Sequence, residues 1–165
     1  MRLVIIDMMN LAFRSYYGYR ELATSTGHPT GVCYGFTKAL TKIIDTYSPT
    51  HIVVAKDTGG KTFRHEIYDG YKSNRSDKPI DLDPQIQDLN RMIDAYGITV
   101  VSAPGFEADD VIGSLANKFA SPECHVYIAS GDKDFMQLVG PNVSLIRFTN
   151  NGNQLCGHDE VVDKF

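Results

Sequence analysis

The chain has 165 residues, of which 42% are hydrophobic and 22% are charged. These values are ordinary for one soluble globular domain, and they exclude a disordered, collagen-like or low-complexity chain. The net charge of −4 argues against general attraction to a polyanion. No apolar run approaches the roughly 18 residues of a membrane span, and no signal peptide is evident, so we expect a cytoplasmic protein. The three widely spaced cysteines fit free thiols better than a disulfide framework or a zinc site.

Strands and helices alternate along the chain. Short apolar runs predict strands at 3–6, 52–55, 98–101, 126–129 and 143–148. Helical spacing predicts helices at 10–19, 32–47, 83–96 and 107–120, a short helix from about 132 to 139, and the start of another at 159–165. This alternation is typical of an α/β fold with a mostly parallel sheet and right-handed crossovers.

Two of the predicted boundaries depend on particular residues. Asp83 and Pro84 resemble an N-cap followed by proline at the first helical position, and Gly97 is placed to end that helix. In the helix at 107–120 we expect Phe119 to be buried with the other apolar residues. Residues 58–82 show no clear period, so we expect a long loop or a mobile helical piece there.

Acidic side chains follow four of the predicted strands. Asp7 ends the first strand and Asp57 follows the second; Glu107, Asp109 and Asp110 follow the third; Asp132 and Asp134 follow the fourth. Because the carboxyl ends of parallel strands meet at one edge of a sheet, we expect all seven to converge there.

Such a cluster of carboxylates needs cations. Two carboxylates about 5 Å apart repel by roughly 3 kcal/mol at an effective dielectric constant near 20. Oxygen ligands select hard ions such as Mg²⁺ or Mn²⁺, and two such ions about 4 Å apart commonly cleave phosphodiesters. Any one acid has a simpler explanation, since Asp109 or Asp132 could be an ordinary helix-capping residue. Four acid-bearing strand ends together favour the metal site.

One basic stretch interrupts this acidic chain. Residues 56–78 carry six Lys or Arg against four Asp or Glu. Lys72 and Arg75 lie three positions apart and would share a helical face, where they could hold phosphates beside the acids, and Tyr71 could stack on an unpaired base. A solvated loop with ordinary surface charges is the alternative for each residue, and Arg64 could simply pair with Glu66 or Asp69.

The order of the motifs resembles the N-terminal catalytic domain of the 5′–3′ exonuclease and flap endonuclease family, which includes the 5′ nuclease domain of bacterial DNA polymerase I and the phage 5′ nucleases. The matching blocks are Ile5-Ile6-Asp7 with Asn10 and Phe13-Arg14; Asp57 with Phe63-Arg64 and the run 71–75; Gly105 to Asp110; and Ser130 to Asp134 with Gln137-Leu138. Together they cover nearly the whole chain.

The resemblance implies a three-layer α/β/α PIN-like domain over residues 1–157, with a helical arch at about 61–95. It implies two Mg²⁺ or Mn²⁺ ions held directly or through water by Asp7, Asp57, Glu107, Asp109, Asp110, Asp132 and Asp134. It also implies that Lys72 and Arg75 contact the scissile phosphodiester, so we count them with Asp57 as catalytic residues. Arg64 and Tyr71 would join Lys72 and Arg75 in binding DNA.

The implied activity is metal-dependent hydrolysis of DNA 5′ ends or flaps in replication and repair, in a bacterial nucleoid or phage-infected cell. RNA primers are a further substrate that the resemblance implies. Family members continue into a helix–hairpin–helix domain, so we expect residues 158–165 to begin such a domain, with it or a polymerase supplied in cis or in trans. The alternatives are a PIN-type ribonuclease and a noncatalytic DNA-binding module that needs a partner.

Overall fold

The computed structural model describes residues 1–68, 70–71, 78–149 and 152–162. A six-stranded sheet lies at its centre, with the strand order β3-β2-β1-β4-β5-β6. The strands are β1 (Arg2–Asp7), β2 (His51–Ala55), β3 (Thr99–Val101), β4 (His125–Ala129), β5 (Val143–Thr149) and β6 (Gly152–Cys156). The pairs from β3 to β5 are parallel, and β6 runs antiparallel to β5.

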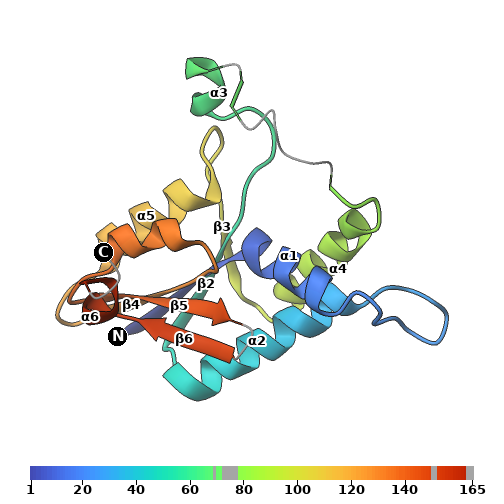
Figure 1. Ribbon diagram of the computed structural model, residues 1–165, viewed down its shortest axis with the longest axis horizontal. Helices are drawn as coiled ribbons and strands as arrows, with labels where there is room; N and C mark the ends of the chain where they lie inside the picture. Colours follow the sequence, from blue (N-terminus) through green and yellow to red (C-terminus); the bar gives the residue numbers. More distant parts are fainter. Residues whose placement is uncertain (69, 72–77, 150–151, 163–165) are drawn as a thin grey trace.

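Helices cover both faces of the sheet, which confirms the predicted three-layer α/β/α architecture (Figure 1). The helices are α1 (Met8–Gly18), α2 (Gly31–Tyr47), α3 (Phe63–Ile67), α4 (Leu82–Ala95), α5 (Ala108–Phe119) and α6 (His158–Val162), with a 3₁₀ helix η1 (Lys133–Leu138). Helices α1, α2 and α4 pack on one face, whereas α5 and η1 pack on the other.

The alternation of side chains along β1 builds two cores at once. Val4 and Ile6 face the α1, α2 and α4 layer, while Leu3 and Ile5 face α5 and η1. All four are buried, so β1 is covered on both faces, as expected for the central strand of a parallel sheet. The burial of β1 fixes the position of Asp7 at its carboxyl end.

Three local predictions were incomplete or wrong. Strand β6 was not predicted, because its sequence is polar and only Cys156 at its end is buried. Helix α4 begins at Leu82 rather than after Asp83, because the Leu82 side chain is fully buried; Pro84 then lies in the first turn, where its missing N–H costs nothing. Phe119 is 37% exposed, because it lies at the last position of α5, where the helix leaves the sheet.

Two other predictions, on Gly97 and on the cysteines, were confirmed. Gly97 ends α4 with a positive φ of 66°. Cys33, Cys124 and Cys156 are free thiols. In the described residues no helix is long and apolar enough to cross a membrane. Helix α6 begins at His158, but whether residues 158–165 start a further domain stays a prediction.

Candidate metal and nucleic-acid site

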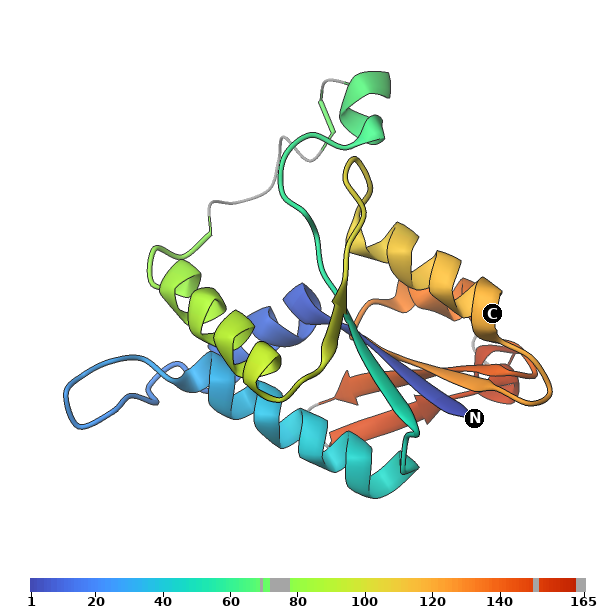
Figure 2. The ribbon, with the colours of Figure 1, turned by 180° about the vertical axis from the view of Figure 1, so that it is seen from behind.

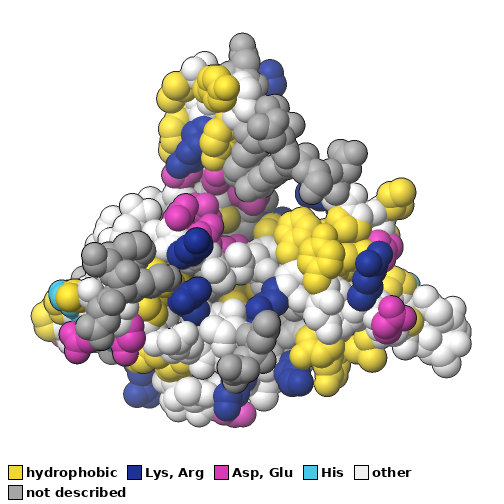
Figure 3. All heavy atoms as spheres, in the orientation of Figure 1, with side chains coloured by type: hydrophobic (Ala, Val, Ile, Leu, Met, Phe, Trp, Pro, Cys, Tyr) yellow, Lys and Arg dark blue, Asp and Glu magenta, His cyan; other side chains and the backbone are white. Residues whose placement is uncertain are grey.

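The predicted acids lie at one edge of the sheet, where β1, β2 and β4 end. In both views α3 stands away from the sheet above this edge (Figures 1 and 2). Acidic side chains gather on the surface where the α3 segment joins the body of the molecule (Figure 3). The site therefore has a floor made by the sheet and α5 and a projecting wall made by α3.

Asp7 is held by two donors at the end of β1. It is only 6% exposed and caps α1, with its Oδ1 accepting the Asn10 N–H at 3.1 Å. Its Oδ2 accepts the Ser130 hydroxyl at 2.8 Å. Burial raises the pKa of Asp7, and the nearby charges of Asp57 and Asp132 add to the effect of burial.

Ser130 links the ends of β1 and β4. Its Oγ also accepts the Asp132 N–H at 3.1 Å, and the neighbouring Gly131 N–H donates to Asn10 Oδ1 at 2.7 Å. A Cβ on Gly131 would lie 2.9 Å from that Asn10 oxygen, so a larger residue would push the Asn10 amide away from its place. Ser130 thus holds Asp7 and Asp132 in a fixed relation.

Asp57 and Glu107 link β2 to the start of α5. Asp57 Oδ1 accepts the Ala108 N–H at 2.7 Å, which satisfies one of the free donors of the helix. Glu107, 7% exposed, is the N-cap residue of α5. Helix capping thus explains part of the role of Asp57 and Glu107. The sequence analysis allowed such a capping role for any single acid.

The convergence of the acids is clearest at Asp109 in the first turn of α5. Its pKa is raised to about 6, first by desolvation and then by the charges of Asp7, Asp132, Asp57 and Glu107. These five carboxylates come from four different segments, so the sheet brings together the residues that the strand-end pattern predicted.

Asp132 and Asp134 lie at the start of η1. Asp132 caps η1 through its Oδ1, which accepts the Asp134 N–H at 2.9 Å. Both residues line a cavity of about 610 Å³ between α5, η1 and the α3 segment, together with Asp109 and Asp110. Asp134 is exposed, so it lies at the rim of the group.

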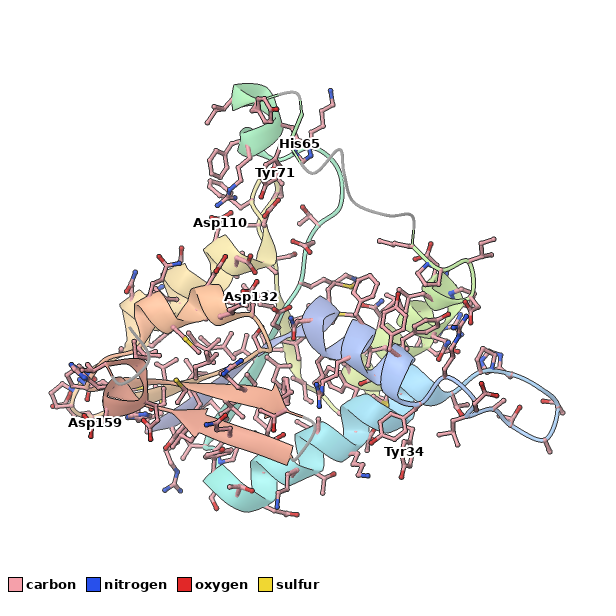
Figure 4. The ribbon with its side chains drawn as sticks, viewed as in Figure 1. Tyr34, His65, Tyr71, Asp110, Asp132 and Asp159 are labelled. Carbon is pink, nitrogen blue, oxygen red and sulfur yellow. The ribbon has the colours of Figure 1, made fainter. Side chains whose placement is uncertain are left out.

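Asp110 has a different environment from Asp109. The Arg64 guanidinium donates from Nη1 to Asp110 Oδ2 at 2.6 Å and from Nη2 to Oδ1 at 2.8 Å. The Tyr71 hydroxyl donates to Glu107 Oε2 at 3.1 Å. Figure 4 shows Tyr71 and His65 above Asp110, with Asp132 nearer the sheet. Arg64 thus pairs with Asp110 rather than with Glu66, and Asp69, the other expected partner, lies outside the described residues.

Lys72 and Arg75, the predicted phosphate-binding cations, lie outside the described residues, so their roles stay predictions. Tyr71 and His65 pack edge to face with ring centres 5.2 Å apart. Phe63 and Phe106 stack beside them with ring centres 5.6 Å apart. The wall above the acids is therefore partly aromatic.

The donor chemistry of the site fits a hard divalent cation. The converging side chains offer carboxylate oxygens without thiol or imidazole ligands among them, the set that Mg²⁺ and Mn²⁺ prefer. In the described residues no three Asp, Glu, His or Cys side chains are already placed to hold one ion.

A family profile described as "5′-3′ exonuclease, N-terminal resolvase-like domain" matches residues 2–165. The chain belongs to this family. DNA polymerase I from Synechocystis is 37% identical over 175 residues, which cover 98% of this chain and 18% of that protein. A 5′-3′ exonuclease from Aquifex aeolicus is 38% identical over 163 residues, covering 99% of this chain and 56% of that protein. The chain thus spans under a fifth of the polymerase and about half of the exonuclease.

Solved structures support the same fold. The T5 D15 protein co-crystallised with metal ions has a TM-score of 0.74 at 20% identity and covers 99% of this chain and 60% of that one. The bacteriophage T5 D15 flap endonuclease in complex with DNA and metal ions has a TM-score of 0.68 at 19% identity. That match covers 99% of this chain and 60% of the T5 chain. The PIN-like architecture expected from the motifs is confirmed.

Asn10 and Ser130 belong to the family motifs, but the sequence alone did not predict their role in holding the acids. A local signal was present in the sequence, because Ser130 directly follows the apolar run 126–129. The structure shows that Ser130 is fully buried. A buried hydroxyl needs a partner, and at this position the available partners are the strand-end carboxylates.

Proposed function

We propose that this chain is the catalytic domain of a divalent-metal-dependent 5′ nuclease that hydrolyses phosphodiester bonds at DNA 5′ ends or flaps. One observation carries the proposal: carboxylates from four separate segments converge at a single edge of the sheet, beneath α3. Membership of the exonuclease family supports the reaction class. The metal ions and DNA named for the T5 proteins support the cofactor and the substrate.

The ions, Mg²⁺ or Mn²⁺, would be held by Asp7, Asp57, Glu107, Asp109 and Asp132, with Asp134 at the rim. When bound, such ions activate water as a nucleophile and stabilise the charge on the phosphate. We expect two ions, because the acids come from both sides of β1.

The chain's own residues orient this group. Ser130 and Asn10 fix Asp7 and the loop that carries Asp132. The Ala108 N–H fixes Asp57. These contacts hold the oxygens before an ion arrives, which lowers the cost of organising the site.

The same charges make DNA binding depend on the ions. The carboxylates whose charges raise the pKa of Asp109 also repel a phosphate, so a nucleic acid backbone can approach only after cations have neutralised them. The projecting wall offers exposed rings, such as Tyr68 at 66% exposure, on which unpaired bases could stack. This combination of ions and exposed rings suits recognition of a single-stranded 5′ end, without recognition of a particular base sequence. RNA primers have the same backbone chemistry and are included in the proposal.

The test is cleavage of a 5′-flap DNA in Mn²⁺, with EDTA as the metal-free arm. Asp132→Asn should lower the rate by at least about a thousandfold, because it removes a ligand and its charge. Asp159→Asn is the matched control, since it makes the same chemical change on α6, far from the site (Figure 4). Products should carry 5′-phosphates.

Two results would overturn the proposal. One is equal cleavage by the Asp132→Asn and Asp159→Asn variants. The other is failure of the wild-type chain to bind Mn²⁺ in a calorimetric titration. Faster cleavage of single-stranded RNA than of the flap would favour the ribonuclease alternative. Metal-dependent DNA binding without cleavage would favour a noncatalytic module.

A further inference from the structure

The ion pair between Arg64 and Asp110 joins α3 to α5, two segments for which the sequence predicted different roles. Arg64 was expected to bind DNA, and Asp110 was expected to bind a metal ion. In the structure the guanidinium Nη1 donates to Asp110 Oδ2 at 2.6 Å and Nη2 donates to Oδ1 at 2.8 Å. A bidentate pair of this kind is strong and directional.

Asp110 is also part of the first turn of α5. Its Oδ2 accepts the Glu107 N–H at 3.0 Å, so the carboxylate caps the helix as well as binding Arg64. Among the described residues, Oδ2 thus accepts from Arg64 and from Glu107, and Oδ1 accepts from Arg64. A metal ion would have to compete with these donors for the same oxygens.

The neighbouring Asp109 faces the other strand-end acids. Its pKa is raised first by desolvation and then by the charges of Asp7, Asp132, Asp57 and Glu107. Adjacent residues on one helical turn therefore face different surroundings.

Among the described residues, the start of α5 supplies the main contacts of α3. None of its described residues is buried. Beyond the Arg64 pair, α3 and its flanks contact the α5 end through the Phe63 N–H, which donates to the Gly105 carbonyl at 3.0 Å, the Phe63–Phe106 stack and the Tyr71–Glu107 hydrogen bond. Arg64 supplies the charged contacts of this set: the close pair with Asp110 and a longer contact with Glu107 Oε2 at 3.9 Å.

We propose that Asp110 is a positioning residue that docks α3 onto α5 by pairing with Arg64, and that the ion-binding set forms without it. This inference rests on the proposed function, because it assumes that ions bind beside α5. Its consequence is that Asp109 serves the ions, while Asp110 sets the position of the wall under which the substrate passes.

The test compares neighbouring residues with the same substitution. Hydrogen–deuterium exchange is measured by mass spectrometry over residues 61–71 in EDTA, and Mn²⁺ affinity by titration calorimetry. Asp110→Asn and Arg64→Gln should each speed exchange in this segment about tenfold, and the double variant should add little, because both break one interaction. Asp109→Asn should leave this exchange unchanged but lower Mn²⁺ affinity at least about tenfold, whereas Asp110→Asn should change the affinity less than about threefold.

Asp110→Asn keeps an oxygen that can accept the Glu107 N–H, so α5 should still fold. Loss of Mn²⁺ binding in Asp110→Asn equal to that in Asp109→Asn would overturn the inference. Unchanged exchange at 61–71 in Arg64→Gln would also overturn it. If the wild-type chain bound no Mn²⁺, the proposed function would fail, but the exchange experiment in EDTA would still decide whether the pair docks α3.

Discussion

The floor and the wall of the candidate site are built in different ways. Asp7 extends from a strand whose side chains are buried on both faces, and buried groups hold its two oxygens. Helix α3 has no buried residue and is held mainly by polar and ring contacts with the start of α5. The core therefore fixes the position of the acidic ligands. The wall is fixed by a few contacts, which a change of charge or exposure to solvent can weaken.

This comparison predicts that changes in the core beneath the floor will have the largest effect on stability. Ile5 is fully buried against the α5 layer. Ile5→Ala should lower the free energy of unfolding by about 2–5 kcal/mol, because it removes buried methyl groups and leaves a cavity. Urea denaturation measures this loss. A loss below about 0.5 kcal/mol would show that the floor does not depend on this core.

The brace at the floor is the next target. Ser130→Ala removes the donor to Asp7 and the acceptor of the Asp132 N–H. We expect ion affinity to fall about 10- to 100-fold, as when other groups that orient metal ligands are lost. Titration with Mn²⁺ measures the change.

Ser144→Ala is the matched control for the brace. Ser144 is also buried and hydrogen-bonded, but its partner is His125 at the opposite end of β4. Equal Mn²⁺ affinities for the two alanine variants would show that Ser130 has no special role toward the ligands.

Removing one charge from the floor should stabilise the chain without ions. Asp109→Asn relieves repulsion from the surrounding carboxylates. In EDTA at pH 7.5 we expect Tm to rise by about 2 °C, a small value because solvent screens an exposed group.

The sign of the pH dependence follows from the raised pKa. The folded chain binds the Asp109 proton up to about pH 6, whereas an unfolded Asp loses its proton near pH 4. Stability from this group therefore falls as pH rises from about 4 to 6, so the advantage of the variant should disappear below this range. A lower Tm for Asp109→Asn at pH 7.5 would contradict the proposed repulsion.

The smallest effect is expected on the wall. Ile67 lies on α3 and is 79% exposed. Ile67→Ala should change the free energy of unfolding by less than about 0.5 kcal/mol, as is usual for exposed positions. Urea denaturation beside Ile5→Ala makes the comparison direct, and a loss as large as that of Ile5→Ala would mean that α3 belongs to the core.

The regular elements and their burial were largely predictable from the sequence. Apolar runs such as 3–6 and helical spacing such as Val32, Phe36 and Leu40 carry their structure in local periodicity. Strand β6 was missed because pairing with β5, rather than an apolar pattern of its own, makes it a strand. For the residues of helix α3 the sequence predicted only a loop or a helical piece. The reason is that α3 buries no side chain, so its sequence shows no apolar periodicity.

By itself the sequence determined an α/β fold and the presence of acids after four strands, because chain alternation and strand ends are local properties. Only the tertiary structure decided how those acids differ. Asp109 and Asp110 are adjacent in sequence, yet Asp109 faces the strand-end carboxylates and Asp110 faces Arg64. One residue turns a helix by about 100°, so neighbours point to different partners, and those partners are set by packing between segments far apart in the chain.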